Sequence, residues 1–545
     1  MAIGSFCLVL HGHMPYVLHH GVWPHGEDWL YEAAAETYLP LLSMIDECNY
    51  LNGNPRLTIG LTPVLLEQLA HDRFKKGFEA YLRNRAEQAA TDRRYFEQET
   101  QPHLSWLAER WETFYQDLSS QFIRISRDIP AAFEKSSRTG AVDLLTSAAT
   151  HGYMPLLLED SSIRAQVRAG LNSSERILGL RPKGIWLPEG AYRPAGRWTP
   201  ATEWGDPDWR RGVDELVSEE GLSYFFVDDH MVMNAGGNDR PSVHQPVWVD
   251  GNGGRAPQMA AFARDPYICK QVWCGFVGYP ADGVYLEFHK RHGPRRGLRY
   301  WKVTDSKSDL GQKDLYYPDD VPGRIYQQAQ HFCGEVKRRL YDYNRQTGKS
   351  GVVVACFDAE LFGHWWFEGP TFLRDVLLTL GADPDVELRT AGNYLSSFRP
   401  EKSVHLPAGS WGEGGDHRVW ACELVKWLWD IEYRCETLFG KLTYHLPWRQ
   451  KPELRRILEK AGRELLLLQA SDWPFVITRR QAPDYGIQRF VQHVARFELF
   501  TEMAERLAED PRYLAGLDPV QKVQIQEADM RDVIFQDIDL NWWNC

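Results

Sequence analysis

Acidic and aromatic residues gather at the end of one apolar run, VVVACFDAELFGHWWFEG at positions 352–369. Its small and β-branched residues predict a buried strand, which leads directly into Asp358 and Glu360 and then into a His, two Trp and a Phe. An unpaired carboxylate is costly in an apolar setting, so a core strand has no structural use for this ending. Acids beside aromatic faces at the end of a parallel strand are typical of a site that cleaves sugars. The structural alternative is that Asp358 caps the helix that follows.

A second acid, Glu189, lies in the run GIWLPEGAYRP. Pro188 and Gly190 shape the backbone on either side, so the turn presents one carboxylate at the end of an apolar strand; the alternative is a surface Glu in a Pro-Gly turn. Glycoside hydrolysis with retention needs a nucleophilic carboxylate and an acid/base carboxyl about 5–5.5 Å apart. Glu189 and Asp358 are 169 positions apart (358 − 189). Only a fold that gathers strand ends, such as a barrel, would bring them together.

Histidines end further apolar runs. His11 and His13 form an HxH pair whose side chains point to the same face of a strand. They are either metal ligands or hydrogen-bonding partners of a sugar, and we favour the sugar because no other clear ligand spacing accompanies them. His151 in AATHGYMP and the DDH run at 228–230 end two more strands. A histidine with structural partners is the alternative for both.

Tryptophan is unusually frequent, with 21 Trp beside 24 Tyr and 24 Phe. Flat aromatic faces with nearby hydrogen-bonding groups suit pyranose rings, which have apolar faces and polar edges. The Gly-rich run GSWGEGGDHRVW at 409–420 contains Trp411 and Trp420 and predicts a glucan-binding loop, the alternative being a helix-entry loop with core Trp. Further cleft candidates are Trp23, Arg264, Trp273 and Asp472.

Seven short apolar runs, most of them ending in polar residues, alternate with helical-looking segments. They are Ser5–His13, Leu57–Pro63, Val142–His151, Gly184–Glu189, Tyr224–His230, Val352–Asp358 and Val386–Thr390. This alternation predicts parallel βα units. We therefore expect an α/β fold built on an incomplete (β/α)7 barrel, with a doubly wound sheet as the alternative.

Other stretches interrupt the alternation. A charged, helix-rich stretch at about 72–135 predicts a helical insertion, and Gly- and Pro-rich stretches at about 231–256 and 275–300 predict loops over the strand ends. After about residue 396 the apolar spacing is helical, and Gly440 is a predicted helix stop. We expect a catalytic barrel over 1–395 and a C-terminal helical domain over 396–545 that contributes to the cleft.

The totals exclude several classes of protein. A formal charge of −12 argues against nucleic acid or an anionic membrane as the main partner. Nine Cys without a CxxC pair predict free thiols rather than disulfides or a zinc ribbon. The first residues, MAIGSFCLVL, lack a basic n-region and are interpreted as a core strand rather than a signal peptide. No run approaches the ~20 apolar residues of a membrane span. We expect a cytoplasmic protein.

At these residues the sequence resembles glycoside hydrolase family 57, specifically its 1,4-α-glucan branching enzyme group. The resemblance covers nearly the whole chain. The runs that resemble the family's motifs are HGHMPY (11–16), LTIGLTPVL (57–65), GIWLPEGAY, FDAELFGHWWFEG and SWGEGGDHRVW, and AATHGYMPLL, AFARDP and ELLLLQASDWPF resemble the group outside them. The resemblance implies an incomplete (β/α)7 barrel, retention of the α-anomer, and no metal or cofactor.

The resemblance also assigns roles. It implies that Glu189 is the nucleophile and Asp358 the acid/base. The residues it implies at the bound sugar or in the cleft are His11, His13, Trp23, His151, Arg264, Trp273, Trp411, Trp420 and Asp472. Three features depart from the group. Gly190 and Cys422 stand where Cys and Asn are usual, and the stretch 231–247 lacks the Tyr that the group carries on a loop over the cleft.

We therefore expect an enzyme that cleaves an α-1,4-glucan and transfers the fragment to a 6-hydroxyl to form an α-1,6 branch. One alternative is a mainly hydrolytic α-amylase-like enzyme or a 4-α-glucanotransferase on the same scaffold. Another is a metal-dependent hydrolase or deacetylase that uses His11 and His13. The last is a glucan-binding protein with a decayed site.

Overall fold

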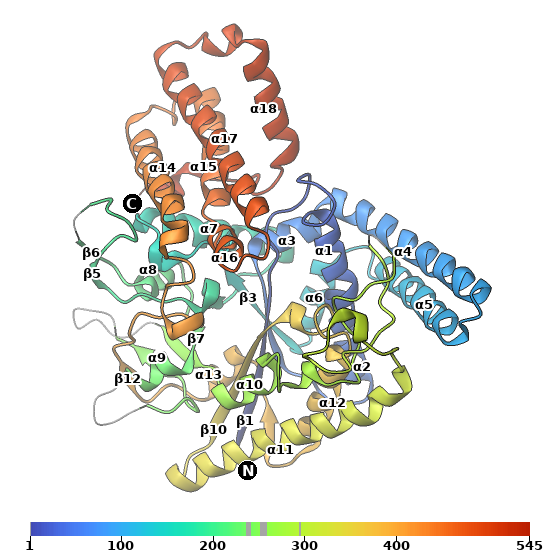
Figure 1. Ribbon diagram of the computed structural model, residues 1–545. Coiled ribbons are helices and arrows are strands. Elements are labelled where there is room, and N and C mark those ends of the chain that lie inside the picture. The colour runs from blue at the N-terminus through green and yellow to red at the C-terminus, as the bar shows by residue number, and fades with distance from the viewer. Residues whose placement is uncertain (1, 206, 236–240, 251–258, 294–295, 545) are drawn as a thin grey trace.

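Parallel strands curl into an open barrel in the computed structural model, which describes residues 2–205, 207–235, 241–250, 259–293 and 296–544 (Figure 1). Neighbouring strands follow the order β10-β1-β2-β3-β4-β7-β9, and each pair along this path is parallel. The bounds are β1 Gly4–Gly12, β2 Leu57–Leu61, β3 Val142–Ser147, β4 Gly184–Trp186, β7 Tyr224–Val227, β9 Ala260–Ala263 and β10 Gly351–Asp358. The expected incomplete (β/α)7 barrel is confirmed.

One strand of the barrel was not expected from the sequence, and one expected strand does not form a separate strand of the barrel. β9 forms from AAFA, whose small residues give a weak strand signal. The expected strand at 386–390 forms β11 (Val386–Leu388), which pairs with the first residues of β1, while β2 pairs with the last ones. β11 and β2 therefore pair with the same edge of β1, and β11 is not a separate strand of the barrel. The sheet continues beyond β9 through β8 (Val247–Val249) and β12 (Ser403–Val404).

Helices cover the outside of the barrel. Those between the strands are α1 Glu27–Ala33, α2 Leu39–Tyr50, α3 Pro63–Ala70, α7 Asp160–Leu178, α8 Val213–Glu219, α9 Asp229–Met233, α10 Pro266–Trp273, α11 Val321–Thr347, α12 Gly369–Ala382 and α13 Ala391–Ser397. The expected insertion consists of α4 (Asp72–Gln98), α5 (Pro102–Arg124) and α6 (Ile129–Arg138). In Figure 1, α4 and α5 project together from one side of the barrel. None of the helices in the described ranges has an apolar stretch long enough to span a bilayer.

The C-terminal part is helical, as expected. It consists of α14 Lys426–His445, α15 Pro452–Leu468, α16 Asp472–Thr478, α17 Pro483–Glu509 and α18 Pro519–Arg531. The prediction that a helix stops at Gly440 was wrong, because α14 continues through it to His445, just before Pro447. Gly440 does not have the positive φ of a glycine stop.

A buried ionic cluster joins the N-terminal strand region to the C-terminal helices. Asp532 accepts a hydrogen bond from His20 (Nε2–Oδ1 2.8 Å) and pairs with Arg496. Close to it, His493 bonds to Glu464 through Nδ1 (2.8 Å). The side chains of Asp532 and His20 are each 1% exposed. Breaking a buried pair leaves an uncompensated charge, so this cluster holds the two regions together.

We expect Asp532→Asn to lower the free energy of unfolding by about 3 kcal/mol, because it leaves the half-buried guanidinium of Arg496 without its buried carboxylate partner. Thermal and denaturant unfolding measure the effect. The matched control is Asp537→Asn, which removes an exposed ion pair with Arg176 (3.2 Å) and is expected to cost under about 1 kcal/mol. Equal losses in the two variants would contradict this role for the cluster.

Candidate active site

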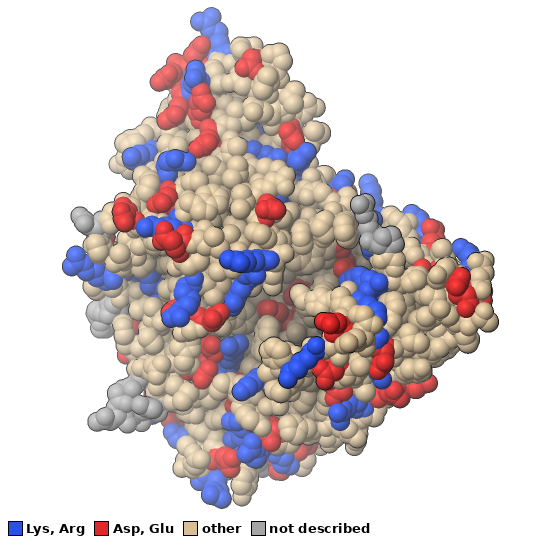
Figure 2. All heavy atoms as spheres, viewed as in Figure 1, with Lys and Arg blue, Asp and Glu red and all other residues tan. Residues whose placement is uncertain are grey.

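A cleft of about 480 Å³ lies where several strands of the barrel end. Its walls come from the residues that follow β4, β7 and β9, from the last residue of β10, from α10, from the 409–420 loop and from α16 and the residue after it. Six of the residues expected from the sequence line it: Glu189, Arg264, Trp273, Asp358, Trp411 and Trp420. Figure 2 shows a hollow near the middle of the face viewed, with basic and acidic side chains around it.

Glu189 follows β4 in a strained turn. Its φ is 60° and its ψ is 22°, in the left-handed region that non-glycine residues rarely adopt. The carbonyl of Glu189 accepts the backbone N–H of Trp411 (3.1 Å), and Tyr192 and Gly409 exchange two backbone hydrogen bonds beside it (2.9 and 3.1 Å). Such over-determined strain is characteristic of functional sites. These bonds fix the 409–420 loop against the strand end.

Two groups define the chemistry of the Glu189 carboxylate. Oε2 accepts the indole N–H of Trp411 at 2.8 Å. Oε1 lies 3.7 Å from Nδ1 of His151, but burial holds the pKa of His151 well below its usual range, so this neighbour is neutral. Burial raises the pKa of Glu189 to about 7, against the lowering effect of the Trp411 bond and of the charge of His13. The arrangement leaves Oε1 as the oxygen available for attack.

We expect Trp411→Phe to move the acidic limb of the pH profile of kcat/KM upward by about one unit or more. A hydrogen bond to a charged group is worth about 1.5–3 kcal/mol, and one pKa unit is about 1.4 kcal/mol. The bond lowers the pKa of Glu189, so its loss raises that pKa, and a nucleophilic carboxylate then ionises only at higher pH. Trp273→Phe is the matched control, because its indole N–H donates to the Cys356 carbonyl (3.3 Å) instead. Equal shifts in both variants would contradict the assignment.

Asp358 ends β10 directly opposite His11 in the register of β1 and β10. Burial, followed by the charges of Glu360 and Glu189, raises the pKa of Asp358 well above its usual range, and Arg264 lowers it only in part. Asp358 therefore keeps its proton at pH values at which an ordinary Asp has lost it. A carboxyl group in this state is suited to act as a general acid.

Glu360, two residues further on, is a third acid and is buried. Its Oε1 accepts the backbone N–H of His13 (3.0 Å) and the hydroxyl of Tyr38. Tyr38 ends a π-helical turn, Ala34–Tyr38, between α1 and α2. These bonds hold Glu360 beside the strand end, where its charge helps to keep Asp358 protonated.

The histidines form a hydrogen-bonded layer beside Glu189. His11 and His151 share a bond between their Nε2 atoms (3.0 Å), and Nδ1 of His151 bonds to the Ser471 hydroxyl (3.0 Å). His13 bonds through Nε2 to Asp472 (3.0 Å). Burial lowers the pKa of His13, but Asp472, Glu360 and Glu189 together outweigh it and the net pKa is raised. The structure thus brings four of the expected residues together, and their contact with a sugar stays a prediction.

The fit of a metal at the HxH pair is poor. The described residues form three groups of closely spaced potential metal ligands, and neither His11 nor His13 belongs to any of them. One of these groups, Asp228–Asp229–His230, borders the cleft, but Asp228 accepts two hydrogen bonds from Arg264 (2.7 and 2.9 Å). The Arg264–Asp228 pair is better explained as a support of the cleft wall.

Aromatic rings continue the cleft on both sides of the acids. Trp411 lies under the guanidinium of Arg264 (5.5 Å to the ring centroid) and meets Trp273 edge to face (5.9 Å between centroids). Trp420 is buried and stacks on Tyr153 (4.7 Å) and Phe475 (6.1 Å). Trp273 is 36% exposed. Its exposed surface makes it the better candidate for stacking on a ring of the substrate.

Trp23 does not line this cleft. It is 49% exposed and borders a separate cavity of about 260 Å³, together with Trp29, Tyr81 and Arg85. Its contact with a glucan stays a prediction. The expected loop at 231–256 lies partly outside the described residues, which omit 236–240 and 251–258, and the expected loop at 275–300 omits 294–295.

Several cleft residues were missed from the sequence. Lys270, Phe475 and Arg479 line the cleft, and the buried Tyr38 and Tyr153 lie behind it, against Glu360 and Trp420. Tyr38 sits inside a helix, where a single polar residue has no distinguishing local pattern, and Phe475 is the last residue of the ELLLLQASDWPF run. Tyr153 lies two residues after His151 in the AATHGYMP run, and this position was the only indication of its role in the sequence.

Two half-buried carboxylates in a Trp-lined cleft, at the carboxyl ends of parallel barrel strands, define an enzyme of the glycoside hydrolase and transglycosylase class. The model of glycosyl hydrolase family 57 matches residues 7–407, and that of the C-terminal domain of 1,4-α-glucan branching enzymes matches residues 433–543. The chain belongs to glycoside hydrolase family 57.

Relatives are similar over nearly the whole chain. A 1,4-α-glucan branching enzyme of Thermococcus kodakarensis is 36% identical over 506 residues, which are 91% of this chain and 73% of the relative. The crystal structure of a family 57 branching enzyme from Pyrococcus horikoshii aligns with a TM-score of 0.90 at 36% identity, covering 99% of this chain and 97% of that one. An α-amylase from Thermotoga maritima aligns with a TM-score of 0.83 at 28% identity, covering 99% of both chains.

Proposed function

We propose that this protein is a 1,4-α-glucan branching enzyme, which cleaves an α-1,4-glucan with retention and transfers the fragment to a 6-hydroxyl. The observation that carries the chemistry is that Glu189 and Asp358 line one cleft while Asp358 stays protonated. Similarity to branching enzymes in both the barrel and the C-terminal helices supports the choice of transfer over hydrolysis.

In the first step, Oε1 of Glu189 attacks the anomeric carbon of an α-1,4-linked glucose, and the bond from that carbon to the glycosidic oxygen breaks. Asp358 delivers its proton to the leaving oxygen, which becomes the 4-hydroxyl of the released chain. The product is a β-linked glycosyl-enzyme. The Trp411 bond on Oε2 keeps the other oxygen of Glu189 oriented toward the sugar.

In the second step, Asp358 acts as a base. It takes the proton of an acceptor 6-hydroxyl, whose oxygen attacks the anomeric carbon and displaces Glu189. The new linkage is an α-1,6 branch, and both carboxyl groups return to their starting states. If water is the acceptor instead, the product is a shorter chain with a new reducing end. The outcome depends on acceptor binding and water exclusion rather than on the acids.

The alternative activity is mainly hydrolytic, and the likeness to the Thermotoga maritima α-amylase favours it. The three departures from the branching enzymes bear on this choice. Gly190 has a positive φ of 56°, a backbone conformation suited to glycine, and a Cβ there would meet Trp411 only at 3.7 Å. Cys422 lies 3.7 Å from the hydroxyl of Thr478. The stretch 231–247 has no Tyr, and its residues 236–240 lie outside the described ranges.

The deciding experiment is incubation of the purified protein with linear amylose, with Glu189→Ala as the control. Proton NMR counts new α-1,6 linkages, and a colour assay counts new reducing ends. Branches that outnumber reducing ends would establish a branching enzyme that needs no Tyr in the 231–247 stretch. Reducing ends without branches would establish a hydrolase. Glucan binding without turnover would support a decayed site.

We expect full activity after EDTA treatment and removal of the chelator. Nε2 of His11 is bonded to His151, both ring nitrogens of His13 are bonded to Thr62 and Asp472, and the proposed steps use carboxyl groups alone. Loss of activity that a divalent ion restores would revive the metal-dependent hydrolase or deacetylase as the explanation.

The proposed substrate is a glycogen- or starch-like α-1,4-glucan, and a role in glycogen synthesis follows from branch formation. We further propose a cytoplasmic location. All eight cysteines in the described residues are free, six of them buried, which suits a reducing compartment. No nucleic acid or membrane partner is proposed.

A further inference from the structure

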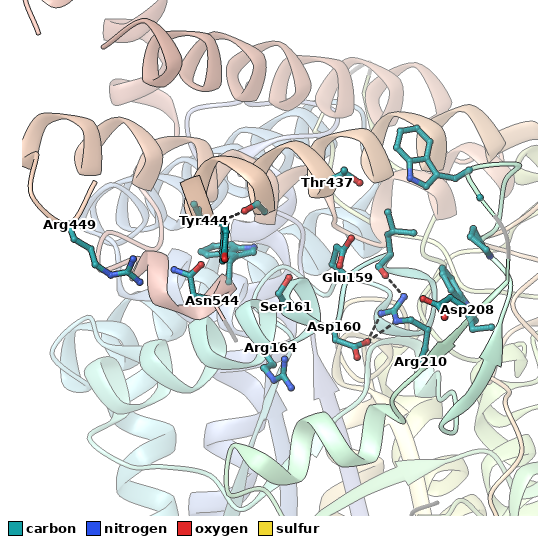
Figure 3. A pocket seen from close by; sticks show the side chains of 18 residues that line it. Glu159, Asp160, Ser161, Arg164, Asp208, Arg210, Thr437, Tyr444, Arg449 and Asn544 are labelled. Carbon is teal, nitrogen blue, oxygen red and sulfur yellow. Dashed lines mark hydrogen bonds and ion pairs between the residues drawn. The ribbon is translucent and has the colours of Figure 1, made fainter. Parts of the chain in front are cut away.

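A second cavity, of about 990 Å³, lies apart from the cleft. It is bounded by the hairpin of β5 (Gly196–Trp198) and β6 (Asp208–Arg210), by the start of α7 and by α14 (Figure 3). It has no lining residue in common with the cleft. Its volume is about twice the ~480 Å³ of the cleft and lies at the upper end of the range for ligand pockets.

Exposed aromatic rings border this cavity. Tyr444 is 79% exposed and Trp204 is 38% exposed, and Trp198 lies deeper, with the guanidinium of Arg210 over its ring (4.9 Å). In Figure 3, Tyr444 and Asn544 lie on one side of the cavity and Asp208 and Arg210 on the other. Rings with neighbouring polar groups are suited to a ligand that has both apolar faces and hydroxyl edges.

The charges around the cavity balance. Three acidic and three basic residues line it: Glu159, Asp160, Asp208, Arg164, Arg210 and Arg449. Arg210 is neutralised by Asp160 (2.6 Å), as the dashed lines in Figure 3 mark. Ser161 and Thr437 add uncharged hydroxyl groups. A wall without net charge favours neither an anion nor a cation, so a neutral polyhydroxylated ligand fits best.

Gly440 supplies an independent observation. It lines the cavity from the interior of α14, where glycine weakens a helix relative to alanine. Its φ is not positive, and a Cβ built there would meet nothing within 4 Å. Neither the backbone nor the packing of the protein therefore requires glycine here. The bare backbone leaves room for a ligand to lie against the helix.

We infer that this cavity is a second glucan-binding site, which holds a segment of an α-1,4-glucan outside the cleft. The inference rests on the proposed function for its choice of sugar. β5 begins seven residues after Glu189 (196 − 189), so the hairpin that bears Trp198 and Trp204 is attached to the strand end that carries the proposed nucleophile. A polymer held there stays close to the cleft, which raises its effective concentration at the acids.

The test is affinity electrophoresis in gels that contain glycogen, with Glu189→Ala as the parent so that the polymer is not modified. Gly440→Phe fills the cavity, and Gly440→Ala, which adds a single carbon into open space, is the matched control. Trp204→Ala combined with Tyr444→Ala removes two exposed rings and decides the matter if Gly440→Phe does not fold. Thermal melting verifies that each variant is folded.

We expect Gly440→Phe and the double variant to bind glycogen about tenfold more weakly than the parent, and Gly440→Ala to match it. With Glu189 intact, the double variant should cleave a short glycosyl fluoride at the normal rate and act more slowly on dilute polymer. If glycogen retards the folded cavity variants as much as it retards the parent, the second site is wrong. The proposed function would still hold in that case, provided that the wild type forms branches. If the cavity variants bind glycogen more weakly but the wild type does not act on amylose, the second site is supported and only the proposed function is contradicted.

Discussion

Replacing Glu189 with Ala is expected to abolish turnover of every substrate, whatever its leaving group. Loss of a covalent nucleophile removes the intermediate itself, and we expect a fall of at least about 10⁴-fold in kcat. A glycosyl fluoride tests the nucleophile separately from the acid. Fluoride leaves without protonation, so an activated substrate cannot compensate for the missing attack. Initial rates on amylose and on α-maltosyl fluoride measure the effect.

Azide provides the stereochemical check for this variant. With the Glu189 side chain shortened, azide has room to enter from the same side as the carboxylate and to displace fluoride directly, which yields the β-glycosyl azide. The control is Glu413→Gln, a carboxylate that lines the same cleft but is 69% exposed and ion-paired with Arg479 (2.9 Å). We expect that control to stay within a few-fold of the wild type. Substantial activity of Glu189→Ala on amylose without azide would rule out this nucleophile.

Replacing Asp358 with Ala is expected to give a loss that depends on the leaving group. General acid catalysis typically contributes about 10²–10⁴-fold, so cleavage of amylose should fall by that order. Formation of the glycosyl-enzyme from maltosyl fluoride should be nearly normal, because no proton is needed. Its breakdown should be slow, since no base remains, and the intermediate should accumulate on Glu189 and be visible by mass spectrometry.

Azide separates Asp358 from Glu189 by the geometry of the product. In Asp358→Ala, azide attacks the β-linked glycosyl-enzyme and displaces Glu189, so the product is the α-glycosyl azide. A β-azide from this variant, or equal losses on fluoride and amylose, would show that Asp358 is not the acid/base. The two variants therefore give opposite anomers, and one NMR spectrum of each product assigns both roles.

The barrel could be predicted from the sequence because most of the expected strands are apolar runs that end in polar residues, and the two candidate acids stand at such ends. The apolar residues before Asp358 form β10, and those before Glu189 form β4. The alternation of such runs with helices indicated parallel strands, whose carboxyl ends meet at one edge. The same reasoning failed for β9, since three Ala and one Phe do not distinguish a strand from a loop.

What the sequence could not predict are contacts between distant segments. Tyr38 reaches Glu360 from a π-helical turn, and nothing near Tyr38 in the sequence indicates a partner 322 positions away. Gly440 was misinterpreted because a glycine after an apolar periodic stretch predicts a helix end. Its true environment, an open cavity beside α14, depends on the β5–β6 hairpin packed opposite. Long-range packing of this kind leaves no local pattern.

The hydrogen bonds that Glu189 and His13 form with later parts of the chain have a consequence during translation. His13 is bound by Asp472, and Glu189 by Trp411, 222 positions later. A ribosome adds about 5–20 residues per second, so the 283 residues from 189 to 472 take about 15–60 s. During that time the nascent chain already contains Glu189 and His13 but does not yet contain all the groups that bond to them. A chain that ends before residue 411 therefore lacks the hydrogen bond from Trp411 to Glu189, and one that ends before residue 472 lacks the bond between Asp472 and His13.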